Sequence, residues 1–175
     1  MKKKIFVLFG LIILAAGLGF SSPRLQFDLG ASIPFFPKTV ENFSPAFKYD
    51  LQFGIPVYAG LGIFVNGGQT FAKFKSTESN VLLSTILFGL DYRFVFAEKN
   101  CVRPSLSLGA FSLLAFDSLS MQGMLVNAKL YYDRILTENL ELNVGAGISL
   151  MFYNGESPFD TYSPLDFTVG VSYMW

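Results

Sequence analysis

Residues 165–175, LDFTVGVSYMW, alternate in the way that is typical of a β-strand with one apolar face. Every second residue is apolar or aromatic: Leu165, Phe167, Val169, Val171, Tyr173 and Trp175. The residues between them are mostly small or polar. The stretch therefore predicts an amphipathic terminal strand, which a soluble β-domain or a membrane barrel could each contain.

This stretch resembles the C-terminal strand of bacterial outer-membrane β-barrels, in which alternating apolar residues and a final aromatic are read by the barrel assembly machinery. The resemblance implies that machinery as a partner. It also implies an assembly signal made of Phe167, Val169, Val171, Tyr173 and Trp175.

The composition is unusual for a soluble protein. The 175 residues fit a single domain; 51% are hydrophobic, 17% aromatic and only 15% charged, against about 25% charged in typical globular chains. Such a chain either buries most of its surface or faces lipid. No apolar run of helix length follows the first twenty residues, so a helical membrane protein is excluded.

The first residues have the pattern of a secretory signal peptide. Lys2, Lys3 and Lys4 precede an apolar run over 5–16 and then small residues. We expect cleavage after Ser21, with Gly17 and Gly19 as alternatives, which makes 1–21 the signal peptide and 22–175 the mature domain. A retained helical anchor is the alternative. No cysteine lies near the cut, so a lipoprotein anchor is not expected.

The remaining charge and cysteine content narrow the range of partners. Without its leader the chain has 10 basic residues, because three of the 13 are removed, against 13 acidic ones. No basic patch is evident, so nucleic acid is not an expected partner. Cys101 is the single cysteine and excludes an intramolecular disulfide. We expect it in a turn over 95–101, as a passive residue more readily than as a redox thiol.

Eight segments alternate with period two and are separated by clusters of Pro, Gly, Asn and Ser. Their lengths approach or exceed the roughly 9–11 residues that cross a bilayer as a tilted strand. Gly67 and Gly68 interrupt the third segment and are compatible with a β-bulge. The eight predicted strands are 25–33, 47–57, 61–71, 82–94, 102–114, 123–133, 140–152 and 165–175.

The position of the charges indicates which face points outward. A soluble barrel would turn the same apolar face inward. Here the apolar positions lack charge entirely, and glycine accompanies the charges on the other face, which suits a narrow lumen better than a face exposed to water. The predicted lumen charges are Asp28, Lys48, Asp50, Asp91, Arg93, Arg103, Lys129, Asp133, Glu141 and Asp166.

We therefore predict an all-β fold, an eight-stranded antiparallel up-and-down transmembrane β-barrel surrounded by outer-membrane lipid. An even number of strands leaves both mature termini in the periplasm. The connections near 56–60, 95–101 and 134–139 are then periplasmic and short. Those near 34–46, 72–81, 115–122 and 153–164 are extracellular and mostly longer, as expected for this class.

The residue inventory argues against catalysis. The chain has no histidine, which outer-membrane barrel enzymes use as a base, and it lacks the usual calcium-loop and phosphate-loop patterns. We predict no enzyme activity, no catalytic residue, no cofactor and no metal site. The lumen charges form either an ion network that plugs the barrel, which we favour, or a narrow polar pathway.

Aromatic residues among prolines mark two of the long connections. They either contact a surface partner or an apolar small molecule, or settle as a belt into the lipid headgroup zone. The candidate contacts are Phe35, Phe36, Phe43, Phe159 and Tyr162.

By its overall pattern the mature chain resembles the small outer-membrane proteins of the OmpA, OmpX and OmpW kind. The resemblance rests on alternation, strand number and the terminal aromatic. It implies a structural or surface-interaction role, with passive passage of small or apolar solutes as the alternative. It specifies neither a ligand nor an oligomeric state.

Overall fold

The computed structural model describes residues 22–35, 41, 43–73, 75, 78–115, 120–153 and 163–175. The predicted strands agree with the observed ones to within three residues at each end, apart from one interruption. No described helix is long and apolar enough to cross a membrane. The strands are β1 Arg24–Pro34, β2 Ala46–Tyr58, β3 Leu61–Lys73, β4 Asn80–Tyr92, β5 Phe94–Ala97, β6 Asn100–Ala115, β7 Ser120–Ile135, β8 Leu140–Tyr153 and β9 Pro164–Met174.

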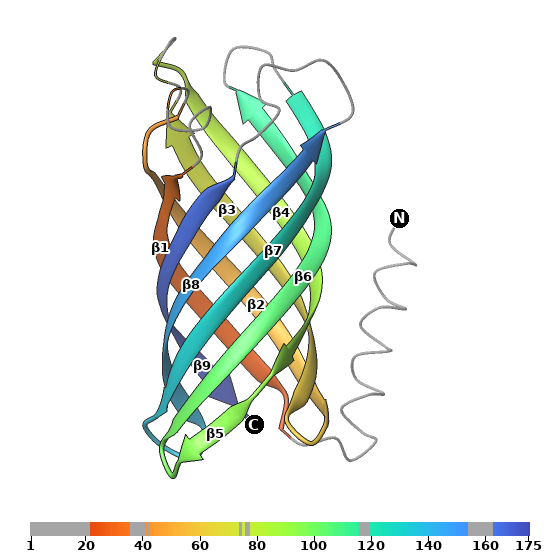
Figure 1. Ribbon diagram of the computed structural model, residues 1–175, viewed down its shortest axis with the longest axis vertical. Coiled ribbons are helices and arrows are strands. Elements are labelled where there is room, and N and C mark those ends of the chain that lie inside the picture. Colours follow the sequence, from red (N-terminus) through yellow and green to blue (C-terminus); the bar gives the residue numbers. More distant parts are fainter. Residues whose placement is uncertain are drawn as a thin grey trace.

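The strands close into an antiparallel barrel (Figure 1). Each strand pairs with its sequence neighbour, and β1 pairs with β9 from Arg24↔Met174 to Pro34↔Pro164. This last ladder removes both sheet edges, so the backbone groups of the strands have partners without water. The predicted up-and-down topology is confirmed.

The fourth predicted strand, 82–94, is interrupted at Arg93. β4 pairs with β6 as far as Asp91↔Ser105, and the pairing resumes at Phe94↔Val102 in the same register. Pro104 lies in the gap on β6 and has no N–H to donate to the ladder. β4 and β5 are thus two parts of one wall strand, and the barrel is eight-stranded.

Gly67 and Gly68, which were compatible with a β-bulge in the sequence, do not form one. Both glycines pair in an unbroken register with β2, and the irregularity in this ladder lies instead between Pro56 and Tyr58. It leads into the tight β2–β3 turn, where Ala59 has φ 42° and Gly60 φ 90°. Positive φ at both turn residues matches the right-handed twist of a hairpin.

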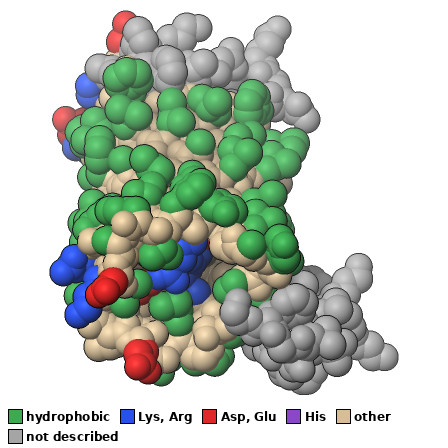
Figure 2. Space-filling model, turned by 60° about the horizontal axis from the view of Figure 1, so that its bottom comes forward, with side chains coloured by type: hydrophobic (Ala, Val, Ile, Leu, Met, Phe, Trp, Pro, Cys, Tyr) green, Lys and Arg blue, Asp and Glu red, His purple; other side chains and the backbone are tan. Residues whose placement is uncertain are grey.

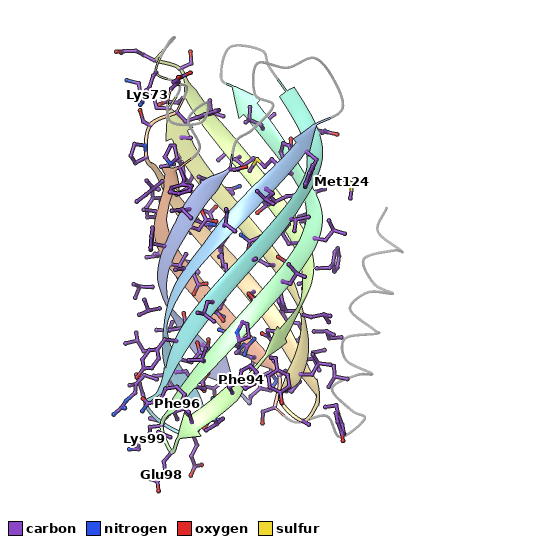
Figure 3. All side chains as sticks on the ribbon, viewed as in Figure 1. Lys73, Phe94, Phe96, Glu98, Lys99 and Met124 are labelled. Carbon is purple, nitrogen blue, oxygen red and sulfur yellow. The ribbon has the colours of Figure 1, made fainter. Side chains whose placement is uncertain are left out.

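Side-chain burial alternates along the strands as a transmembrane wall requires. Outward residues such as Phe88 and Val169 are 62% and 54% exposed, whereas inward Arg103 is 0% exposed. Figure 2 shows hydrophobic side chains covering the wall, and Figure 3 shows Met124 projecting away from it. A soluble barrel would have the opposite arrangement.

The connections differ in length between the two ends of the barrel. Two residues join β2 to β3 and two join β5 to β6, while 11 residues separate β1 from β2 and 10 separate β8 from β9. We call the end with the short turns the β5 end; Glu98 and Lys99 lie there, opposite Lys73 (Figure 3). The first residue of β1, Arg24, pairs with the last residue of β9, Met174, and both lie at the β5 end.

The apolar outer wall predicts that a charged substitution lowers the free energy of unfolding more in the middle of the wall than at a strand end. Val169 lies midway along β9 on the outer wall, so Val169→Lys should lower the free energy of unfolding in lipid vesicles by about 2–4 kcal/mol. Tyr58→Lys, at the end of β2, is the matched control and should cost no more than about 1 kcal/mol. Urea titration followed by tryptophan fluorescence measures both. Equal costs at the two positions would contradict a membrane-embedded wall.

Candidate functional site in the barrel interior

The ten charged side chains predicted to line the lumen all lie on the inward phase of the strands. Nine of them are buried, and the Arg93 side chain is 23% exposed. They come from seven of the eight wall strands, and closure of the barrel brings together those of distant strands, such as Lys48 and Asp166. Nine of them form two clusters and one separate ion pair, and the tenth, Asp28, is held by neutral hydrogen-bond partners.

The first cluster joins β2, β7 and β9. Lys48 Nζ contacts Asp166 Oδ2 at 2.9 Å and Asp50 Oδ2 at 3.3 Å, and Lys129 Nζ contacts Asp50 Oδ2 at 2.8 Å. Asp166 also accepts hydrogen bonds from Ser149, at 3.0 Å, and from the Ser32 hydroxyl. Two lysines and two aspartates therefore neutralise one another in a water-poor interior, which compensates part of their desolvation cost.

The second cluster centres on Arg103 of β6. Its Nε donates to Asp133 Oδ2 at 2.8 Å and its Nη2 to Oδ1 at 3.2 Å, the bidentate geometry that suits a guanidinium and a carboxylate. Its Nη1 contacts Asp91 Oδ2 at 3.2 Å, and its Nη2 also donates to Gln26 Oε1 at 2.7 Å. The guanidinium carbon lies 4.3 Å from the centre of the Tyr131 ring. All three guanidinium nitrogens of Arg103 therefore contact carboxylate or amide oxygens.

Arg24 is a member of this cluster that the sequence prediction missed. Its Nη2 donates to Asp91 Oδ2, and the residue is 8% exposed. The prediction began the first strand at Leu25. One residue more would have placed Arg24 in phase with Asp28, since the strand period is two.

The separate ion pair lies at the β5 end, where Arg93 Nη2 donates to Glu141 Oε1. Arg93 Nε also contacts Cys101 Sγ at 3.2 Å, and its Nη1 contacts Met174 Sδ at 3.5 Å. Cys101 was expected in a turn; it is instead the second residue of β6, fully buried with a free thiol. The turn itself contains only two residues, so the strand begins earlier than predicted.

Asp28 differs from the other lumen carboxylates because its partners are neutral. Gln26 Nε2 donates to its two oxygens at 3.0 and 2.8 Å, and the Tyr131 hydroxyl donates at 3.1 Å. With Arg24 included, five basic side chains meet six carboxylates inside the barrel. Asp28 is the carboxylate for which hydrogen bonds replace a direct ion pair.

The inward glycines make room for these carboxylates. A Cβ atom built on Gly68 would overlap Asp50 Oδ1, and one on Gly170 would overlap Asp28 Oδ1. A Cβ atom on Gly62 would likewise overlap Asp91 Oδ1. The co-occurrence of glycine and charge on one face is therefore a packing requirement of a narrow lumen, as predicted from the sequence.

Away from the β5 end the interior is apolar, which the prediction did not anticipate. The signal was present, because several inward positions of the alternation are large and apolar. Phe43 belongs to this cluster at 2% exposure, so its side chain is not presented outward as a candidate contact would be. The apolar cluster comprises Phe43, Ala46, Ala72, Val81, Leu83, Leu87, Phe111, Leu113, Leu125 and Met151.

Little space remains between the charged and apolar parts. A cavity of about 20 Å³ there is lined by Lys48, Asp50 and Leu87, among others. Of the remaining predicted loop contacts, Phe35 is 58% exposed, while Phe36, Phe159 and Tyr162 lie outside the described residues. Within the described ranges, no group of three or more Cys, Asp or Glu side chains could hold a metal ion.

The contacts of Arg103 predict a large loss of stability when it is removed. Arg103→Met leaves Asp133 without its bidentate partner, so the free energy of unfolding should fall by about 3–5 kcal/mol. Arg134→Met, at an exposed arginine of the β5 end, should change it by less than about 0.5 kcal/mol. Adding Asp133→Leu to Arg103→Met should restore most of the loss. Equal stability of the two single variants would contradict a buried ion network.

Comparisons place this geometry among known folds. No protein-family model and no curated protein sequence matches the chain. The crystal structure of Neisserial surface protein A (NspA) is similar, with a TM-score of 0.65 at 12% identity over 88% of this chain and 97% of that one.

Two further barrels are similar at the same level. Ail, the attachment invasion locus protein of Yersinia pestis, has a TM-score of 0.54 at 12% identity and covers 90% of this chain and 99% of its own. The outer membrane protein OprG from Pseudomonas aeruginosa has a TM-score of 0.55 at 12% identity and covers 89% and 96%. At this identity the likeness concerns the fold. The chain has the fold of the small eight-stranded outer-membrane β-barrels.

Proposed function

We propose that this chain is an integral outer-membrane protein whose barrel is closed to solutes and carries its connections as a surface-interaction scaffold. It has no catalytic role in this proposal. Residues 1–21 serve as its signal peptide, and the barrel assembly machinery recognises the outward residues of β9. These residues, from Phe167 to Trp175, lie on the lipid-facing wall and are about half exposed.

The difference between the two ends supports an orientation. Outer-membrane barrels have short periplasmic turns and longer extracellular connections. We therefore place the β5 end, with both mature termini, in the periplasm. The long connections around 35–45 and 154–163 then face the exterior, where a partner would meet them.

The observation that carries the closed-lumen proposal is the network of buried charges. Its members bond to one another across the interior, and the apolar cluster fills the other end. The cavity between them, about 20 Å³, has room for about one water molecule. An eight-stranded barrel is just wide enough for its side chains to fill, so a continuous water path requires these groups to move.

The connections supply the interaction surface in this proposal. Phe35 projects at the extracellular end of β1 and is 58% exposed. An exposed aromatic on a rigid scaffold suits contact with another surface or with an apolar small molecule. Changes in the connections should then alter binding, whereas changes in the lumen should not.

The second candidate is passive passage of small solutes. It is favoured by polar side chains that line the interior from the β5 end to the apolar cluster, and by the partly exposed Arg93 at one mouth. In that case the lumen charges would act as a gate, and substitutions there would change permeation.

Conductance across a planar bilayer separates the two candidates. The folded protein should give no discrete current steps, and Asp50→Ala and Arg93→Ala should remain silent because the apolar cluster still blocks the barrel. A heat-dependent shift in gel migration verifies folding, and a known porin in the same bilayer is the positive control. Discrete steps altered by Asp50→Ala or Arg93→Ala would contradict the closed scaffold and support transport.

A further inference from the structure

A hollow of about 320 Å³ opens at the β5 end, below the buried charge clusters. Figure 2, in which the bottom of the barrel comes forward, shows basic side chains inside it. The interior cavity is far smaller, at about 20 Å³. The lining includes Ser22, Arg24, Gly54, Asp91, Arg93 and Met174.

Arg93 presents donors to this hollow that have only weak acceptors. Two of its nitrogens contact sulfur, Cys101 Sγ at 3.2 Å and Met174 Sδ at 3.5 Å. Sulfur is a weak hydrogen-bond acceptor, and a guanidinium has five N–H groups to place. Glu141 is its one carboxylate partner. A ligand with strong acceptor oxygens would improve on the two sulfur contacts.

Arg24 adds a second guanidinium with unused donors. Its Nη2 is bonded to Asp91, while its buried Nε has no hydrogen-bond partner in the described part of the chain. Asp91 is also shared with Arg103 at 3.2 Å. The lining therefore holds two guanidinium groups and a single carboxylate, which already serves two arginines. Glu141 and Asp133 are each 0% exposed and do not line the hollow.

We propose that this hollow binds a phosphate-type oxyanion, with Arg24 and Arg93 as its ligands. A guanidinium donates two parallel N–H bonds, which match the oxygens of a phosphate. Gly54 leaves space beside Arg24, because a Cβ atom built there would lie 3.4 Å from Arg24 Nη2. Ser22 also lines the hollow, and cleavage after Ser21, as in the proposed function, would make it the amino-terminal residue. The phosphate comes either from solution or from the headgroup of a lipid beside the β5 end.

Titration of the folded protein with inorganic phosphate tests the proposal. In an uncharged detergent, ³¹P NMR line broadening should show saturable binding, and Arg93→Gln should weaken it at least tenfold. Arg134→Gln, which removes an exposed arginine at the same end, should stay within twofold of the parent protein. Gly54→Leu keeps every charge but fills the hollow, so it should also abolish binding and serves where Arg93→Gln does not fold.

Nanodiscs distinguish the two sources of phosphate. A headgroup site predicts that inorganic phosphate is excluded from protein in phosphatidylglycerol nanodiscs but binds to protein in nanodiscs of an uncharged lipid. A site for free phosphate predicts saturable binding in both, with at most a weaker apparent affinity beside the anionic lipid, which repels phosphate. The proposal is overturned if the parent protein shows no saturable phosphate binding in detergent and uncharged nanodiscs. It is also overturned if folded Arg93→Gln and Arg134→Gln variants bind alike.

Discussion

A charge inside a narrow barrel must find its partner inside the same barrel, and this constraint organises the structure. The outer wall faces hydrocarbon, so the charged side chains in the middle of the strands are directed inward, and exposed ones such as Arg134 and Lys73 lie at strand ends. Inside the barrel, Lys48 and Lys129 reach carboxylates from strands distant in the sequence. Such pairs form only when β1 meets β9. Barrel closure and charge neutralisation therefore depend on each other.

The polar interior is confined to one part of the lumen. The charge clusters and Arg93 extend to the β5 end, whereas Phe111, Leu113 and Met151 fill the other end. A barrel closed by ions alone would admit water whenever a lysine changed rotamer. The apolar cluster is a second closure that does not depend on charge, and the hollow lined by Arg24 and Arg93 opens at the β5 end.

The wall was predictable from the sequence for two reasons. Side chains alternate between the two faces of a strand, and lipid requires one of those faces to be apolar. Alternation located all eight wall strands, and the absence of charge in one phase identified the outer face. The interior was less predictable. Whether Lys129 meets Asp50 or Asp28 depends on the stagger of the strands, and no short-range pattern encodes it. The break at Arg93 lies beside Pro104, which has no N–H to donate and which the register of the flanking pairs places opposite Tyr92.

Other misses have local causes. Arg24 lay one residue outside the predicted first strand, and Cys101 was assigned to a turn because its strand begins earlier. Phe43 was considered a surface contact from its proline-rich surroundings, yet it packs inside. In each case a residue at a strand end takes its environment from the interior of the barrel and not from its sequence neighbours.

Hydrogen exchange at the guanidinium groups tests most directly whether the charges form a closed network. The chain has four arginines, Arg24, Arg93, Arg103 and Arg134, so ¹⁵N-arginine labelling in nanodiscs gives a simple spectrum. In a closed network, the Nε–H of Arg103 should exchange at least a hundredfold more slowly than that of Arg134. Exchange at Arg103 as fast as at Arg134 would mean that water reaches the centre of the barrel, and would contradict the account.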